Sequence, residues 1–156
     1  MWKLTKLGIS AAISLILPAS LLASPAVAAN CDASSFSSGA GTSADRFVVL
    51  TATQFRNIQA CDGVQKYFSI QADIDLQNSA FTPFGSGSYF VSDVKGEVFD
   101  GTNTRSAIVQ GLNVNTSRAG LVGTAGSGAK LQNLQIIGSV VGSSYTGGLI
   151  GLAEPD

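Results

Sequence analysis

The feature that most constrains the fold is a repeated tetrapeptide bounded by glycines. Gly120-Leu121-Val122-Gly123 returns 28 residues later as Gly148-Leu149-Ile150-Gly151. The apolar stretch Leu131 to Ile136 lies between the two copies. A unit of this size has one apolar face that only a neighbouring unit can cover, so it is stable when units stack. The repeat therefore predicts a β-solenoid rather than a single compact core.

Short apolar segments separated by glycines continue this pattern through the second half of the chain. They predict short strands joined by tight corners. Aligning Leu112-x-Val114 with Leu134-x-Ile136 gives an offset of 22 residues, which we take as the length of one coil. The longer offset of the tetrapeptides then requires extra residues in the second coil, and we expect them around Gly142 to Gly147.

The segment before the repeats divides into three parts. Residues 30–45 are rich in Ser and Gly and are expected to form a loop, and residues 46–66 to form a small cap of strand and helix. Thr51 and Gln54 fit a capping box at the start of that helix. From Phe68 to Leu76 apolar and polar residues alternate, which predicts a half-buried strand. The solenoid is expected to occupy residues 67–156.

The N-terminus has the pattern of a secretory signal peptide in residues 1–29. Lys3 and Lys6 precede an apolar stretch, and small residues follow it, so we place cleavage after Ala28 or Ala29. The apolar stretch is shorter than a spanning helix and contains Pro18, and the mature chain is expected to have no transmembrane segment. The protein is therefore predicted to be secreted or displayed on the cell surface.

Charge and cysteine content narrow the class of protein further. The chain has 9 Lys and Arg against 10 Asp and Glu, a formal net charge of −1, which argues against nucleic acid as a partner. Cys31 and Cys61 are the two cysteines, and in an exported protein a single pair is expected to form a disulfide. Two separate thiols are the alternative, because the sequence does not reveal their geometry.

The sequence has no histidine, which removes most common hydrolase mechanisms and most catalytic zinc sites. Asp73 and Asp75 are the one close pair of carboxylates, and alternation puts both on the outward face, roughly 7 Å apart. Such a pair could serve a polysaccharide lyase or hydrolase, or bind calcium together with Asp93, Glu97 or Asp100. We expect instead that these carboxylates are solvated or hold turns, with no cofactor and no enzymatic activity.

Three aromatic residues are candidates for contact with a ligand. Tyr89, Phe90 and Tyr145 could stack on sugar rings, although packing in the core or at corners is the simpler interpretation.

Together these segments resemble the GLUG-type repeat family of bacterial surface proteins. The resemblance covers residues 46–151, and its ordered pieces are Phe47 to Ile58, Asp73-Ile74-Asp75-Leu76, Thr82-Pro83-Phe84-Gly85, Gly96 to Gly101 and the two glycine-bounded tetrapeptides. Thr102-Asn103-Thr104 departs from the family, where Asn-Gly is expected. The resemblance implies a right-handed β-helix in an adhesin-like protein, with a cell-surface glycan or protein as partner.

Relatives usually continue into another coil where this chain reads Leu152 to Asp156, so we expect a truncated solenoid. An uncapped last coil would expose unpaired strands and permit end-to-end self-association. The sequence thus favours a non-enzymatic adhesion or display domain. A stalk or cap fragment of a larger surface protein and a relic of a polysaccharide enzyme are the alternatives.

Overall fold

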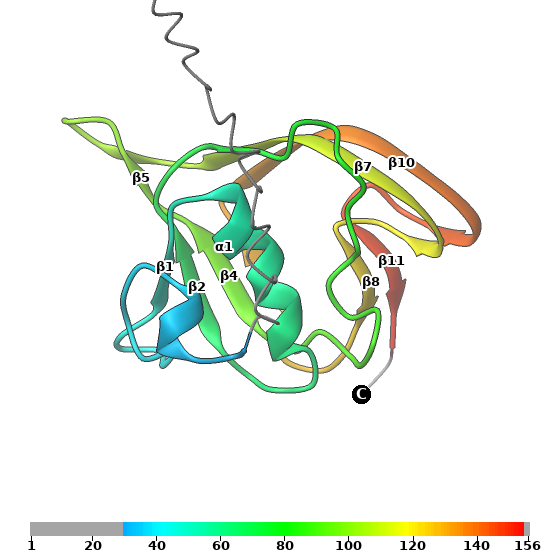
Figure 1. The fold of residues 1–156 in the computed structure, drawn as a ribbon, viewed down its shortest axis with the longest axis horizontal. Coiled ribbons are helices and arrows are strands. Elements are labelled where there is room, and N and C mark those ends of the chain that lie inside the picture. Colours follow the sequence, from blue (N-terminus) through cyan, green and yellow to red (C-terminus); the bar gives the residue numbers. More distant parts are fainter. Residues whose placement is uncertain (1–29, 155–156) are drawn as a thin grey trace, which may run out of the picture.

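The structure, a computed structural model, describes residues 30–154 and consists mostly of strands with little helix (Figure 1). The high strand content agrees with the expected all-β class. Most strands pair in parallel. The predicted signal peptide and the predicted cleavage residues Ala28 and Ala29 lie outside the described residues.

The N-terminal part contains the helices among the described residues. The 3-10 helix η1 covers Ala33–Ser35, the strand β1 covers Phe47–Val49, and the helix α1 covers Ala52–Asn57 and continues as the 3-10 helix η2, Ile58–Cys61. Thr51 caps α1 by accepting a hydrogen bond from the Gln54 amide at 3.2 Å, while the Gln54 side chain accepts one from the Leu50 amide at 2.9 Å. This is close to the predicted capping box, with the return bond displaced by one residue.

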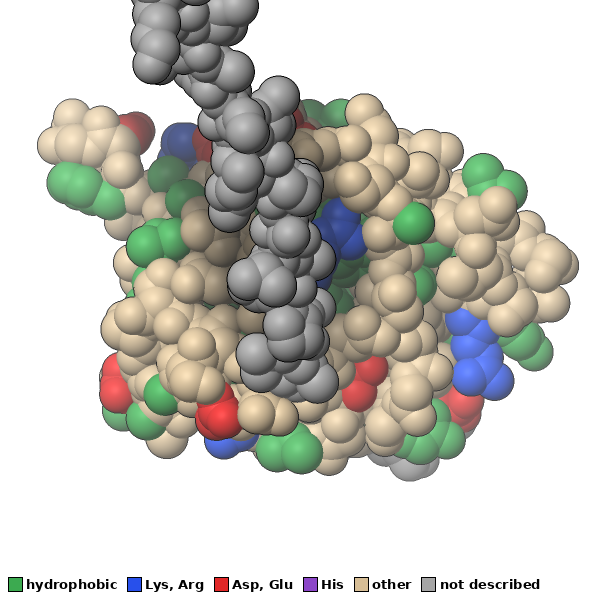
Figure 2. All heavy atoms as spheres, viewed as in Figure 1, with side chains coloured by type: hydrophobic (Ala, Val, Ile, Leu, Met, Phe, Trp, Pro, Cys, Tyr) green, Lys and Arg blue, Asp and Glu red, His purple; other side chains and the backbone are tan. Residues whose placement is uncertain are grey.

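Three parallel sheets make up the body of the molecule. The first has the order β1-β2-β4-β9, the second β10-β7-β3 and the third β11-β8. Their strands are β2 (Tyr67–Ile70), β3 (Ile74–Asp75), β4 (Asp93–Gly96), β7 (Ala107–Ala119), β8 (Val122–Ala125), β9 (Lys130–Gln132), β10 (Leu134–Thr146) and β11 (Ile150–Ala153). A short antiparallel hairpin, β5 (Val98–Phe99) with β6 (Thr104–Arg105), projects from this body (Figure 1 and Figure 2).

The core is formed by ladders of apolar residues that are in register across each sheet. In the first sheet Phe47, Phe68, Val94 and Leu131 are successive partners. In the second sheet Ile74 and Ile136 both pair with Val109. Parallel pairing in register places side chains of equal type on the same face, so each strand covers the apolar residue of its neighbour.

The tetrapeptide repeat is confirmed as a structural repeat, whereas the 22-residue offset is wrong. Val122 pairs with Ile150, which is the predicted offset of 28. Leu112, however, pairs with Gly138 and not with Leu134, and Leu134 pairs with Ala107, so β7 and β10 are offset by 26 or 27 residues. Part of the extra length lies where it was expected, because the register shifts between Gly142 and Tyr145.

The alternating stretch Phe68 to Leu76 is not one strand. It forms β2 and β3, with a bend between them at residues 71–73, so the chain turns from the first sheet into the second. Ser69, predicted to face outward, is buried and donates to the Glu97 carboxylate at 2.8 Å. A buried hydroxyl is tolerated here because its hydrogen bond is made.

The two ends of the sheets differ. At β1 the preceding chain closes the edge: the Ser37 amide donates to the Val48 carbonyl, and the Val48 amide donates to the Ser38 carbonyl, both at 2.9 Å. Near β3, Arg56 of α1 donates to the carbonyls of Leu76 and Ala80. At the other end β9, β10 and β11 are each the outermost strand of their sheet among residues 30–154.

Candidate functional site

The carboxylate pair singled out in the sequence is used to hold the fold. Asp73 forms a two-pronged ion pair with Arg105, with distances of 2.8 and 2.7 Å, and accepts a hydrogen bond from the Ile108 amide at 3.0 Å. The hydrogen bonds from Arg105 and from Ile108 lower the pKa of Asp73. Asp73 is therefore a fully ionised anchor between β3 and the start of β7.

Asp75 has a local role as well. Its Oδ1 accepts from the Gln77 amide at 2.8 Å and its Oδ2 from the Gln110 side chain at 3.2 Å. Gln77 and Asn78 both have positive φ, of 57° and 53°, so the carboxylate supports a sharp turn in an unfavourable backbone conformation. Both carboxylates of this pair thus make structural contacts within the fold.

The other carboxylates considered for calcium are also engaged. Asp93 pairs with Arg46 at 3.1 Å, and Glu97 pairs with Lys95 at 2.6 Å. Asp100 accepts from the amides of Thr102 and Asn103 and so closes the β5–β6 hairpin. Among residues 30–154 no group of three or more potential metal-ligating side chains comes together.

The glycines of the repeat are explained by close packing of backbone on backbone. A Cβ added to Gly120 would lie 2.9 Å from the Gly147 carbonyl oxygen, and one added to Gly151 would lie 3.0 Å from that of Gly123. Gly148 differs, since nothing lies within 4 Å of its would-be Cβ. Gly120 and Gly151 thus allow adjacent layers to approach closely, whereas Gly148 lies open to solvent.

Cys31 and Cys61 form the predicted disulfide, with a Cα–Cα distance of 4.9 Å. The bond ties the first described residues to the end of η2. It fixes the N-terminal cap and takes no part in the pocket described next.

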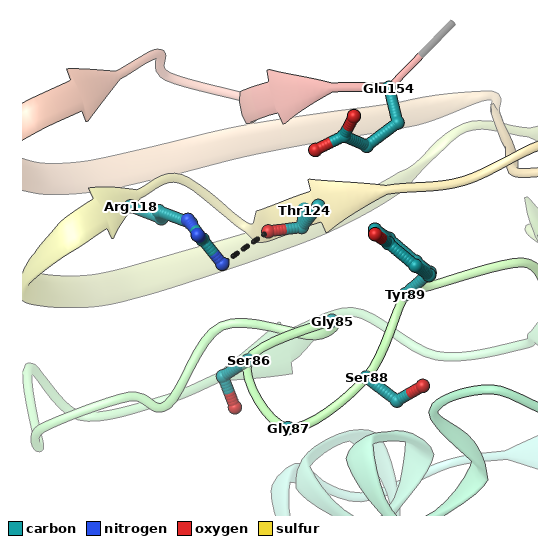
Figure 3. A pocket seen from close by; sticks show the side chains of 8 residues that line it. All are labelled: Gly85, Ser86, Gly87, Ser88, Tyr89, Arg118, Thr124 and Glu154. Atoms are coloured by element: carbon teal, nitrogen blue, oxygen red, sulfur yellow. Dashed lines mark hydrogen bonds between the residues drawn. The ribbon is translucent and has the colours of Figure 1, made fainter.

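A polar pocket lies beside the loop between Phe84 and Phe90 (Figure 3). Both phenylalanines are buried, their rings stack with centroids 5.6 Å apart, and they bridge to Val122 and Ala125 of β8. Gly85 follows the first of them with a φ of 75°, where its missing side chain lets the loop pass the Thr124 carbonyl. The loop Gly85–Tyr89 is therefore anchored at both ends.

Asp62, which follows η2, holds this loop by a hydrogen bond. Its carboxylate accepts a hydrogen bond from the Gly85 amide at 2.8 Å. Burial raises the pKa of Asp62 from 3.8 to about 6, although the backbone amides of Gly85, Ser86 and Gly87 oppose that shift. The loop thus rests on a carboxylate that changes charge near neutral pH.

The pocket has a volume of about 330 Å³ and combines one aromatic ring with several polar groups. Tyr89 is 52% exposed, whereas Phe90 is buried in the core. Arg118 at the end of β7, Thr124 of β8 and Glu154 after β11 complete the lining, and Arg118 donates to the Thr124 hydroxyl at 3.4 Å (Figure 3). Tyr145 is 51% exposed but does not line this pocket.

The lining offers hydroxyl groups, a guanidinium, a carboxylate and a ring face. It has donors, acceptors and a stacking surface for a hydroxyl-rich ligand, but no nucleophile paired with a general base. Of the lining residues, only Tyr89 was predicted from the sequence to contact a ligand. The Gly-Ser-Gly-Ser run before Tyr89 was the available signal, because small residues leave room beside a ring.

The structure places no helix among the described residues that is long and apolar enough to cross a membrane. A scan against family models gave no match, and searches of curated proteins and of solved structures gave none.

Proposed function

We propose that this protein is an exported, non-enzymatic β-solenoid domain that attaches to or displays itself at the cell surface by binding a glycan in the Tyr89 pocket. The coil is proposed to be right-handed and of the GLUG-repeat type, with the strand, helix and disulfide as its N-terminal cap. Support for the solenoid comes from the three parallel sheets, whose strands recur in register along the chain.

The observation that carries glycan binding is the combination of an exposed tyrosine ring with polar groups around one hollow. A sugar presents an apolar face to an aromatic ring and hydroxyls at its rim, and ligand pockets start at about 300 Å³. The Tyr89 pocket, at about 330 Å³, has the size for one or two sugar rings. Export agrees with the disulfide, because such bonds persist in oxidising compartments.

The experiment is a glycan-array screen of the chain from Asn30 onward, followed by calorimetry with the best ligand. We expect Tyr89→Ala to weaken binding by about three- to tenfold, since ring stacking is worth about 0.5–1.5 kcal/mol beyond the area buried and about 1.4 kcal/mol corresponds to tenfold. Tyr145→Ala is the matched control, because the two tyrosines are equally exposed and only Tyr89 lines the pocket. Absence of any glycan ligand, or equal losses in both variants, would refute the proposal.

The non-enzymatic part is supported by the structural engagement of Asp73 and Asp75. It is tested on uronic-acid polymers with the wild type and the double variant Asp73→Asn, Asp75→Asn. Turnover by the wild type that the double variant lacks would favour a polysaccharide lyase or hydrolase instead.

A structural stalk within a larger surface protein is the second candidate, and the outermost position of β9, β10 and β11 favours it. A stalk needs no ligand of its own. It would be favoured if the array shows no binding while the open reading frame in the DNA continues with further repeats.

A further inference from the structure

The last three strands leave part of the apolar interior open to solvent. A hollow of about 320 Å³ is lined by Leu112 of β7, by Leu134, Ile136 and Val140 of β10, and by Leu149 before β11. Leu112 is fully buried, but Leu149 is 41% exposed. The hollow therefore lies where another layer of apolar side chains would fit.

Apart from Lys130, the first residue of β9, the strands of this face carry no charge. Residues 131–153 contain no charged residue and no proline, and Glu154 follows them. Edge strands that must stay single usually carry lysine, proline or an irregularity. The irregularities of β10 lie outside Gly138–Gly142, which pairs regularly with β7 and leaves a regular outer edge.

The opposite end of the sheets is covered by other parts of the chain. There the outer edge of β1 is bonded to Ser37 and Ser38, and Arg56 occupies the carbonyls of Leu76 and Ala80. Phe55 of α1 covers Phe81 and Phe84. Among the three parallel sheets of residues 30–154, a second copy thus offers unpaired strand edges at its own β9–β11 face, and pairing of like faces gives a closed pair and not an open-ended filament.

We propose that the β9–β11 face is a self-association surface on which two copies of this chain pair end to end about a twofold axis, with β10 lying antiparallel to β10 of the second copy. A twofold rotation reverses the strand direction but keeps inward residues inward, so the two hollows join. Because β10 and β11 carry no charged residue, like charges do not oppose the contact of β10 with β10 of the second copy. This inference is independent of the glycan proposal.

The test is sedimentation velocity of the chain from Asn30 onward across a wide range of concentrations. We expect a monomer–dimer equilibrium without larger species. Leu149→Lys should weaken the dimer at least about tenfold, because a lysine would be buried without a partner. Leu50→Lys is the matched control, since Leu50 is 44% exposed and lies at the capped end next to β1. It should leave the dimer unchanged, and thermal melts establish that both variants fold.

A second measurement needs no variant. Amide hydrogen exchange in Gly138–Gly142 should slow as the concentration of the wild type rises, while exchange in β1 should not change. A wild type that stays monomeric, a series of growing oligomers, or a dimer that tolerates Leu149→Lys but not Leu50→Lys would each overturn the proposal.

Discussion

The two ends of the stacked strands bury the same kinds of residue to different extents. Phe47 and Phe68 in the N-terminal strands of the first sheet are buried, while their ladder partner Leu131 in β9 is only partly buried. In the third sheet Val122 is fully buried, and its partner Ile150 is 37% exposed. An apolar residue in a parallel ladder is thus covered only when a further layer lies over it.

The largest expected effect on stability comes from truncating a buried leucine, compared with truncating a partly exposed one. Leu112→Ala should lower the free energy of unfolding by about 3–4 kcal/mol, because it leaves a cavity in a packed interior. Leu149→Ala should cost only about 1 kcal/mol, since its side chain is already partly in water. Urea denaturation of dilute, monomeric protein measures both, and equal losses would remove the distinction between the ends.

Breaking the disulfide tests the cap. The double variant Cys31→Ser, Cys61→Ser should lose about 3.5 kcal/mol by loop-closure entropy, because the bond closes a separation of 30 residues. Reduction of the wild type should have the same effect in a thermal melt. A stability unchanged by both treatments would mean that the cap is held without the bond.

Glycine substitutions compare backbone packing inside the stack with its outer layer. In Gly96→Ala the new Cβ would lie 2.0 Å from the Asn133 carbonyl oxygen and 2.6 Å from the Ala107 amide nitrogen, so about 2 kcal/mol or more should be lost. Gly148→Ala is the control and should stay within about 0.5 kcal/mol of the wild type, because its Cβ would meet nothing within 4 Å. Chemical denaturation decides, and a stable Gly96→Ala variant would contradict the tight parallel packing.

The smallest effect concerns the loop at the Tyr89 pocket. The pKa of Asp62 is raised to about 6 in the folded protein, above its ordinary value of 3.8, so the folded state binds the proton more tightly. Its contribution to stability is complete below about pH 4 and is lost as the pH rises through 6. The shift alone corresponds to about 3 kcal/mol, and because the carboxylate is only half-buried we expect about 1 kcal/mol.

The pH profile can be assigned to this residue. The folded protein lowers the pKa values of Asp73, Glu97 and Asp100 from their ordinary values of 3.8 to 4.5. Their contribution to stability is complete at a pH above these ordinary pKa values and is lost as the pH falls below them. Between pH 4.5 and 7 the decline should therefore follow Asp62. Asp62→Asn should flatten it, and an unchanged decline in this variant would assign the effect elsewhere.

The sequence could predict those parts of the fold in which a position accepts a single residue type, such as glycine where two backbones approach closely. The repeat that contains Gly120 and Gly151 predicted the pairing of β8 with β11. Glycine is required at both positions because a side chain would keep the backbones of the two layers apart. The alignment of Leu112 with Leu134 failed for a physical reason. An alternating apolar pattern fits any even offset, and the sequence does not reveal that Gly138 makes room for Leu112.

The candidate site was less predictable. Tyr89 could be noticed from its type, but Arg118, Thr124 and Glu154 reach the same hollow from three separate strands or their ends. Their proximity depends on the register of strands that are far apart in sequence, such as Phe90 opposite Ala125. Neither composition nor local pattern determines those registers.

Peptide-resolved amide hydrogen exchange of the dilute monomer tests the central claim most directly, namely that parallel layers are closed at the N-terminal end and open at β9–β11. The account predicts slow exchange in β2, β4 and β7 and exchange at least about a hundredfold faster in β10 and β11, which open locally at lower free energy. Uniform protection across all strands, or faster exchange in β2 than in β10, would contradict it.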